Sequence, residues 1–204
     1  MDIWPVVHAE RKALVTDLSG LDADQWSTTS LATDWTVRDV VAHMTATAKI
    51  TPGGFFPKLV SNGFSFSKMQ AKDITAESGS STADTLANFD AIVTSTKRPP
   101  GPPATMLGET VVHSQDIRGA LGIQHDYPMA ALVQVADFYK GSNLVIGTKK
   151  RIAGLTLKAT DTQWSHGSGP EVTGPMLALL MAMTGRKVTD QLAGDGVETL
   201  RSRP

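Results

Sequence analysis

The chain of 204 residues contains no cysteine. It can therefore form neither a disulfide scaffold nor a zinc site with thiolate ligands. The absence of disulfide chemistry makes the cytosol the expected location. Any thiol chemistry would also need a thiol that is supplied by a cofactor.

A long hydrophobic run and an excess of basic charge are also missing. The longest apolar run, from Met176 to Met183, is too short to cross a bilayer, and the first residues lack the pattern of a signal peptide. The net charge of -1 at pH 7 provides no basic surface for nucleic acid. We therefore expect a small-molecule substrate as partner, no nucleic acid and no membrane. The oligomeric state stays open.

Hydrophobic residues make up 41% of the chain and charged residues 19%, which favours a packed globular core. Helical periodicity and capping signals predict helices over residues 5–19, 37–50, 82–96, 106–121 and from 128 onward. After Lys149 the pattern changes, because residues 154–160 alternate with period two and predict a strand. We predict an α+β protein with a metal-binding helical bundle in residues 1–148 and a small α+β domain in residues 149–204.

The candidate site is built on Glu109 and His113. They are four residues apart, so a helix places both side chains on one face. His43, on the predicted helix 37–50, could supply a third ligand. One carboxylate and two imidazoles form a three-ligand site for a divalent metal with a position left open. Asp39 and Asp116, each about one turn from a histidine, could accept the spare ring N–H.

Other interpretations of these residues remain open. A glutamate and a histidine with this spacing often form a surface pair, and a single histidine on an apolar face often donates to a backbone carbonyl. The metal hypothesis is favoured because Val111, Val112 and Ile117 make the second helix apolar. Burying Glu109 on such a helix would be costly without a partner.

Two segments carry a resemblance to a known family. They are residues 35–44, WTVRDVVAHM, and residues 108–122, GETVVHSQDIRGALG. Both resemble the metal-ligand segments of the DinB-like four-helix bundle superfamily, and more narrowly the actinobacterial mycothiol-dependent maleylpyruvate isomerase family. Residues 157–165, 167–170, 174–186 and 192–196 resemble the small C-terminal domain of that family.

The resemblance implies a DinB-like four-helix bundle followed by a small α+β domain that is sterol-carrier-like. It implies that His43, Glu109 and His113 are zinc ligands and that Arg186 is an active-site arginine. It also implies mycothiol as thiol cosubstrate. An alternative for Arg186 is a solvated side chain that caps a helix C-terminus.

The predicted function is that of a metal-dependent enzyme that uses mycothiol for isomerisation or S-transfer on a small organic acid or electrophile. Two alternatives remain. One is a metal-dependent hydrolase with zinc-bound hydroxide as nucleophile. The other is a non-catalytic module that binds a small molecule and holds a structural metal.

Overall fold

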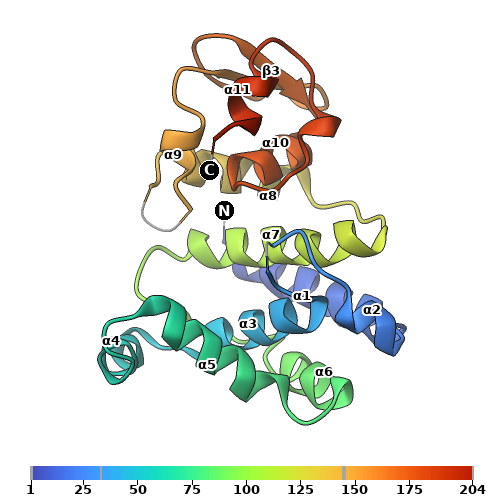
Figure 1. Cartoon of the computed structure of the whole chain (residues 1–204), viewed down its shortest axis with the longest axis vertical. Helices are drawn as coiled ribbons and strands as arrows, with labels where there is room; N and C mark the ends of the chain where they lie inside the picture. The colour runs from blue at the N-terminus through green and yellow to red at the C-terminus, as the bar shows by residue number, and fades with distance from the viewer. Residues whose placement is uncertain (1, 33, 144–145, 204) are drawn as a thin grey trace. The chain divides into compact units, whose positions relative to one another are not determined.

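The computed structural model describes residues 2–32, 34–143 and 146–203. The chain divides into two compact units, Met1–His125 and Asp126–Pro204, and each unit is described by itself (Figure 1). No helix within the described ranges is both long and apolar enough to cross a membrane.

The first unit is entirely helical apart from its connections. Its helices are α1 (Trp4–Ser19), α2 (Ala23–Ser27), α3 (Val37–Lys49), α4 (Pro52–Ser61), α5 (Phe66–Ser78), α6 (Thr82–Asp90) and α7 (Ala104–Leu121). Figure 1 shows α3 in the interior of this unit, with α7 on one side and α5 on the other. The expected continuous helix 82–96 is shorter than predicted, since α6 ends at Asp90.

The hydrophobic core of the first unit is organised around α3. This helix packs against α2, α5, α6 and α7, and its apolar side chains share one core cluster with side chains of α1. The core side chains are Leu14, Leu18, Trp26, Val37, Val40, Val41, Met44, Ala48, Phe89, Ile92 and Ile117. Removal of these side chains from water is the main favourable contribution to the stability of the unit.

A buried ion-pair network joins α7 to α1. The Arg118 side chain is completely buried, and its Nε donates to Asp17 Oδ2 at 2.8 Å. Its Nη1 lies 3.5 Å from Glu10 Oε2. Because an unpaired buried charge is strongly destabilising, this network favours one register of α7 against α1. The register places the residues of α7 that face α3.

Local sequence signals fix the ends of the two central helices. A capping box begins α3: the Thr36 side chain accepts from Asp39 N at 3.2 Å, and Asp39 Oδ2 accepts from Thr36 N at 3.0 Å. Gly122 ends α7 in the left-handed conformation at φ 68°. The start of α3 and the end of α7 are therefore defined by local contacts.

The second unit is a small α+β structure. Its elements are α8 (Met129–Tyr139), α9 (Thr148–Arg151), β1 (Thr156–Ala159), β2 (Ser165–Gly167), β3 (Glu171–Gly174), α10 (Met176–Met183), a 3-10 turn (Thr189–Gln191) and α11 (Val197–Arg201). The strand order is β2-β1-β3, with β1 antiparallel to β2 and parallel to β3. The apolar helix α10 packs against α8, β1 and β3.

The architecture confirms the predicted fold class, a helical N-terminal part followed by a small α+β part. Two details differ from the sequence analysis. Residues 165–167, which lie outside the predicted strand 154–160, form the edge strand β2. The compact units meet after His125, whereas the sequence analysis places the domain boundary after residue 148. The reason is that α8 packs against α10 and so belongs to the second unit.

Replacing Thr36 by alanine should lower the free energy of unfolding by about 1 kcal/mol, because one orphan N–H at the start of α3 loses its acceptor. Urea denaturation measures this loss. The Thr36→Ser variant keeps the hydroxyl and should retain most of the stability. Equal losses in the two variants would show that the capping hydroxyl does not stabilise α3.

Candidate metal centre

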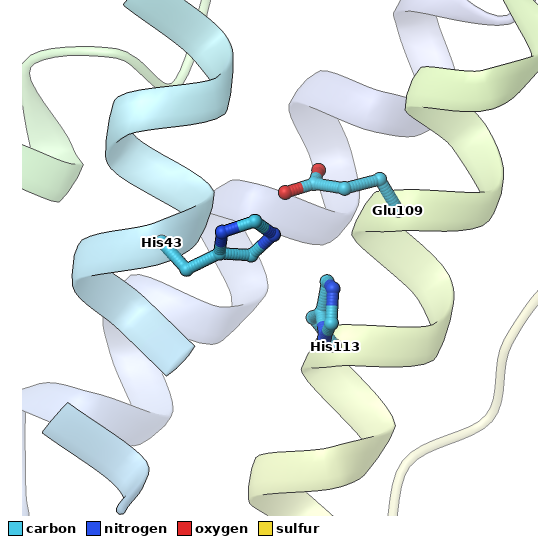
Figure 2. Close-up of side chains that lie close together, drawn as sticks. All are labelled: His43, Glu109 and His113. Atoms are coloured by element: carbon cyan, nitrogen blue, oxygen red, sulfur yellow. The ribbon is translucent and has the colours of Figure 1, made fainter. Parts of the chain in front are cut away.

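Three side chains from two helices converge inside the first unit. His43 extends from α3, and Glu109 and His113 extend from α7 toward it (Figure 2). Their potential ligand atoms all lie within 4.8 Å of one another. The ring centroids of His43 and His113 are 4.9 Å apart, and the rings are nearly perpendicular at 80°. The structure thus brings together the three residues that the sequence analysis proposed as metal ligands.

The convergence follows from the geometry of the two helices. Glu109 and His113 are one turn apart on α7, so their side chains leave the helix on the same face. His43 lies beside the buried apolar face of α3, and α3 packs against α7. Side chains on rigid helices are well suited to hold a metal with little rearrangement.

A buried carboxylate orients the His113 ring. Asp116 Oδ2 lies 2.9 Å from His113 Nδ1, and the Asp116 side chain has no exposed surface. A carboxylate in this place holds the ring proton on Nδ1, which leaves Nε2 as the ligand atom. Asp116 therefore occupies the position that the sequence analysis suggested. Asp39 instead completes the capping box of α3.

The surroundings of His43 were not predicted from the sequence. Gln70 Nε2, from α5, lies 3.5 Å from His43 Nδ1. The Trp35 ring packs against both imidazoles, with centroid distances of 4.8 Å to His43 and 6.1 Å to His113. Nothing in the spacing of residues 51–81 tied that segment to the site, because the contact of Gln70 depends on how α5 packs against α3.

The Glu109 carboxylate is buried without a hydrogen-bond partner. Both of its oxygens are buried, and no described residue places a donor within hydrogen-bond distance of either. Burial raises the pKa of Glu109, while His113 and Arg11 act in the opposite direction. A buried carboxylate without donors is unfavourable unless a cation lies beside it. The residues present therefore fit a bound cation.

Arg11 places a permanent cation near this carboxylate. Its side chain, from α1, is fully buried. Nη1 donates to Ser95 O at 2.9 Å and to Ile92 O at 3.3 Å, whereas Nε and Nη2 have no hydrogen-bond acceptor among the described residues. Burial lowers the pKa of Arg11, and the charge of Glu109 raises it. The sequence analysis did not single out Arg11, since an arginine on an amphipathic helix is normally solvated.

The remaining candidates lie outside the group of three. Among the described residues, only His43, Glu109 and His113 form a group of potential metal ligands. His8, on α1, has a buried Nε2 that forms no hydrogen bond with the described part of the chain, and it does not belong to that group. Arg186 follows α10 in the second unit, where its Nη1 donates to Thr184 O at 3.1 Å. Its role as an active-site arginine stays a prediction.

The fold and the site together define a class, the helical-bundle proteins with a candidate metal centre of two histidines and one glutamate. The comparison with family models narrows it. Residues 7–99 match the family described as mycothiol maleylpyruvate isomerase N-terminal domain. The match confirms, for this part of the chain, the resemblance stated from the sequence. His43 lies within the matched residues, whereas Glu109 and His113 follow them.

Solved structures agree with this assignment of the fold. A crystal structure of the mycothiol-dependent maleylpyruvate isomerase superimposes with a TM-score of 0.65 at 16% identity, covering 94% of this chain and 91% of that one. A point mutant of that enzyme gives a TM-score of 0.64 at 15% identity with the same coverage. A search of curated protein sequences gives no match.

Glu109 should make the stability of the metal-free protein depend on pH. Below the ordinary glutamate pKa of 4.5, the carboxyl is neutral in both the folded and the unfolded chain. Burial raises the pKa of Glu109 in the folded state. Stability is therefore lost as the pH rises from the ordinary glutamate pKa to the raised pKa of the folded protein. The loss is at most about 1.4 kcal/mol for each pH unit in this interval.

Glu109→Gln, which cannot ionise, provides the matched control. With a chelator present, its stability advantage over the wild type should grow as pH rises above the ordinary glutamate range, as measured by urea denaturation. A difference between the two proteins that is constant with pH would show that Glu109 does not carry a raised pKa.

Asp116→Asn should weaken metal binding about 10–100-fold, because the ring of His113 loses the carboxylate that fixes its orientation and raises its basicity. Competition with a chromogenic zinc chelator measures the affinity. Asn88→Ala, which alters a side-chain contact outside the site, should keep the affinity of the wild type. Unchanged zinc affinity in Asp116→Asn would contradict the assigned role of Asp116.

Proposed function

We propose that this protein is a metal-dependent enzyme that uses a low-molecular-weight thiol, in particular mycothiol, for isomerisation or S-transfer on a small organic acid or electrophile. The family match of residues 7–99 and the helical architecture support the thiol-dependent part of the proposal. The three converging side chains support the metal-dependent part. Metal and thiol are two separable claims.

One observation carries the proposal, the buried Glu109 carboxylate beside two imidazoles. Both of its oxygens lack donors, and the ligand atoms of the three residues lie within 4.8 Å of one another. Two neutral imidazoles and one carboxylate are a ligand set that zinc accepts with one coordination position left for a further ligand. Zinc is therefore the metal that we propose.

When bound, zinc would act as a Lewis acid and lower the pKa of a thiol at its open position. Because the chain has no cysteine, the thiol must come from the cosubstrate. Asp116 would hold the proton of His113 on Nδ1, and the Trp35 ring would cover one side of both imidazoles. The charge of Arg11 would add to the positive potential that attracts an anionic thiolate.

Arg186 is the proposed residue for the organic acid. Its guanidinium could form a bidentate pair with a substrate carboxylate, or bind the polar groups of mycothiol. Burial and the neighbouring Arg186 charge lower the pKa of Arg151, so two cations lie close together in the second unit.

The protein should bind about one zinc per chain, and mycothiol should raise its melting temperature only when zinc is present. His43→Ala should lose both effects, because one of three ligands is missing and zinc affinity falls steeply. Elemental analysis and thermal shift measure the two quantities. His166→Ala, which removes a histidine of β2 outside the group of three, is the matched control and should behave like the wild type.

The outcomes separate the two claims and the alternatives. Zinc binding without stabilisation by mycothiol would overturn the thiol part alone. Hydrolysis of esters or amides by the zinc protein without added thiol would favour the hydrolase. Absence of stoichiometric zinc in the wild type would overturn the metal part.

A further inference from the structure

The exposed hydrophobic side chains of this protein are concentrated in one short segment. Four large hydrophobic side chains are exposed within the described residues, and all four belong to α4, the following turn or the start of α5. Their exposed fractions are 62% for Phe56, 54% for Val60, 73% for Phe64 and 47% for Phe66. We call these four residues the phenylalanine surface. Exposed hydrophobic side chains that cluster in this way often mark an interaction site, whereas isolated ones are common on any protein surface.

The local structure keeps these side chains away from the core. None of the residues of α4 is buried. Phe56 and Val60 are one turn apart on α4 and share a face. Phe64 has a φ of 58° in the turn between α4 and α5, a conformation that bulky residues rarely adopt. A strained and highly exposed phenylalanine is explained more readily by a contact outside the chain than by folding.

The charge around this surface is positive. Residues 50–72 contain Lys58, Lys68 and Lys72 and no acidic residue, in a chain whose net charge is -1. Lys58 forms an ion pair with Asp73 at 2.5 Å. Lys68 and Lys72 are exposed, one turn apart on α5, and make no ion pair with any described residue. The partner that complements this region is therefore apolar and anionic.

We propose that the phenylalanine surface docks on a lipid bilayer that contains anionic headgroups. Exposed phenylalanines that insert at the interface, flanked by lysines that attract the headgroups, are the features of a peripheral membrane contact. A second copy of this chain is disfavoured as occupant, because a two-fold contact would bring two copies of this positively charged region together. This contact is peripheral, so the absence of a membrane-spanning run does not exclude it.

The proposal is tested by co-sedimentation of the full chain with vesicles. Vesicles that contain phosphatidylglycerol should bind the protein at low salt, and vesicles of phosphatidylcholine alone should bind much less. Phe56→Ser/Phe64→Ser should weaken binding at least about tenfold, since two aromatic side chains no longer leave water. Phe56→Leu/Phe64→Leu should keep most of the binding.

The electrostatic part has its own matched pair of variants. Lys68→Glu/Lys72→Glu should weaken binding to the anionic vesicles by at least about fivefold for each lysine. Lys149→Glu/Lys150→Glu changes the net charge equally but alters exposed lysines of the second unit. It should bind like the wild type. Equal losses of vesicle binding in the two double variants would show that binding depends only on net charge. That result would overturn the assignment of the membrane contact to the phenylalanine surface.

Three other outcomes would also overturn the proposal. The wild type could fail to bind anionic vesicles at low salt. Sedimentation velocity without lipid could show a dimer that Phe56→Ser/Phe64→Ser dissociates, which would make a second copy the occupant. The same variant could lower the melting temperature of the monomer, which would show that the chain itself covers these side chains.

Discussion

The structure depends on one electrostatic constraint, the burial of the Glu109 carboxylate. Its two oxygens are buried and accept no hydrogen bond from any described residue, and such a group is unfavourable in a protein interior without a positive charge nearby. Arg11 supplies one such charge from α1, and burial still raises the pKa of Glu109 in its presence. A divalent cation between Glu109, His43 and His113 would compensate the carboxylate directly. The burial of Glu109, which is unfavourable in the metal-free protein, would therefore favour the binding of a metal.

The rest of the first unit serves to hold this arrangement. The capping box fixes the start of α3, and the Arg118 network fixes the register of α7 against α1. Asp116 and Trp35 then restrict the histidine rings. Each of these contacts contributes a small free energy, and together they keep three ligand atoms close to one point. Such preorganisation is what a metal site with an open position requires.

The sequence could predict the parts of this site that depend on local spacing. The i, i+4 pair on α7, the capping box of α3 and the carboxylate one turn after His113 all follow from helical geometry. Gln70, Trp35 and Arg11 could not be found in this way, because their places depend on how separate helices pack. For the same reason the unit boundary differs, since only the packing of α8 on α10 assigns α8 to the second unit. The exposure of the phenylalanines could not be predicted either, because an apolar helix is expected to be buried unless the packing of its neighbours is known.

The most direct test of the central claim is zinc K-edge X-ray absorption on the zinc-loaded protein. The account predicts a first shell with two imidazole nitrogens and one carboxylate oxygen at about 2.0–2.2 Å, completed by an exchangeable light-atom ligand. Addition of mycothiol should introduce one sulfur scatterer at about 2.3 Å. A shell without imidazole scattering, or one that is the same in the His43→Ala and His113→Ala variants, would contradict the account.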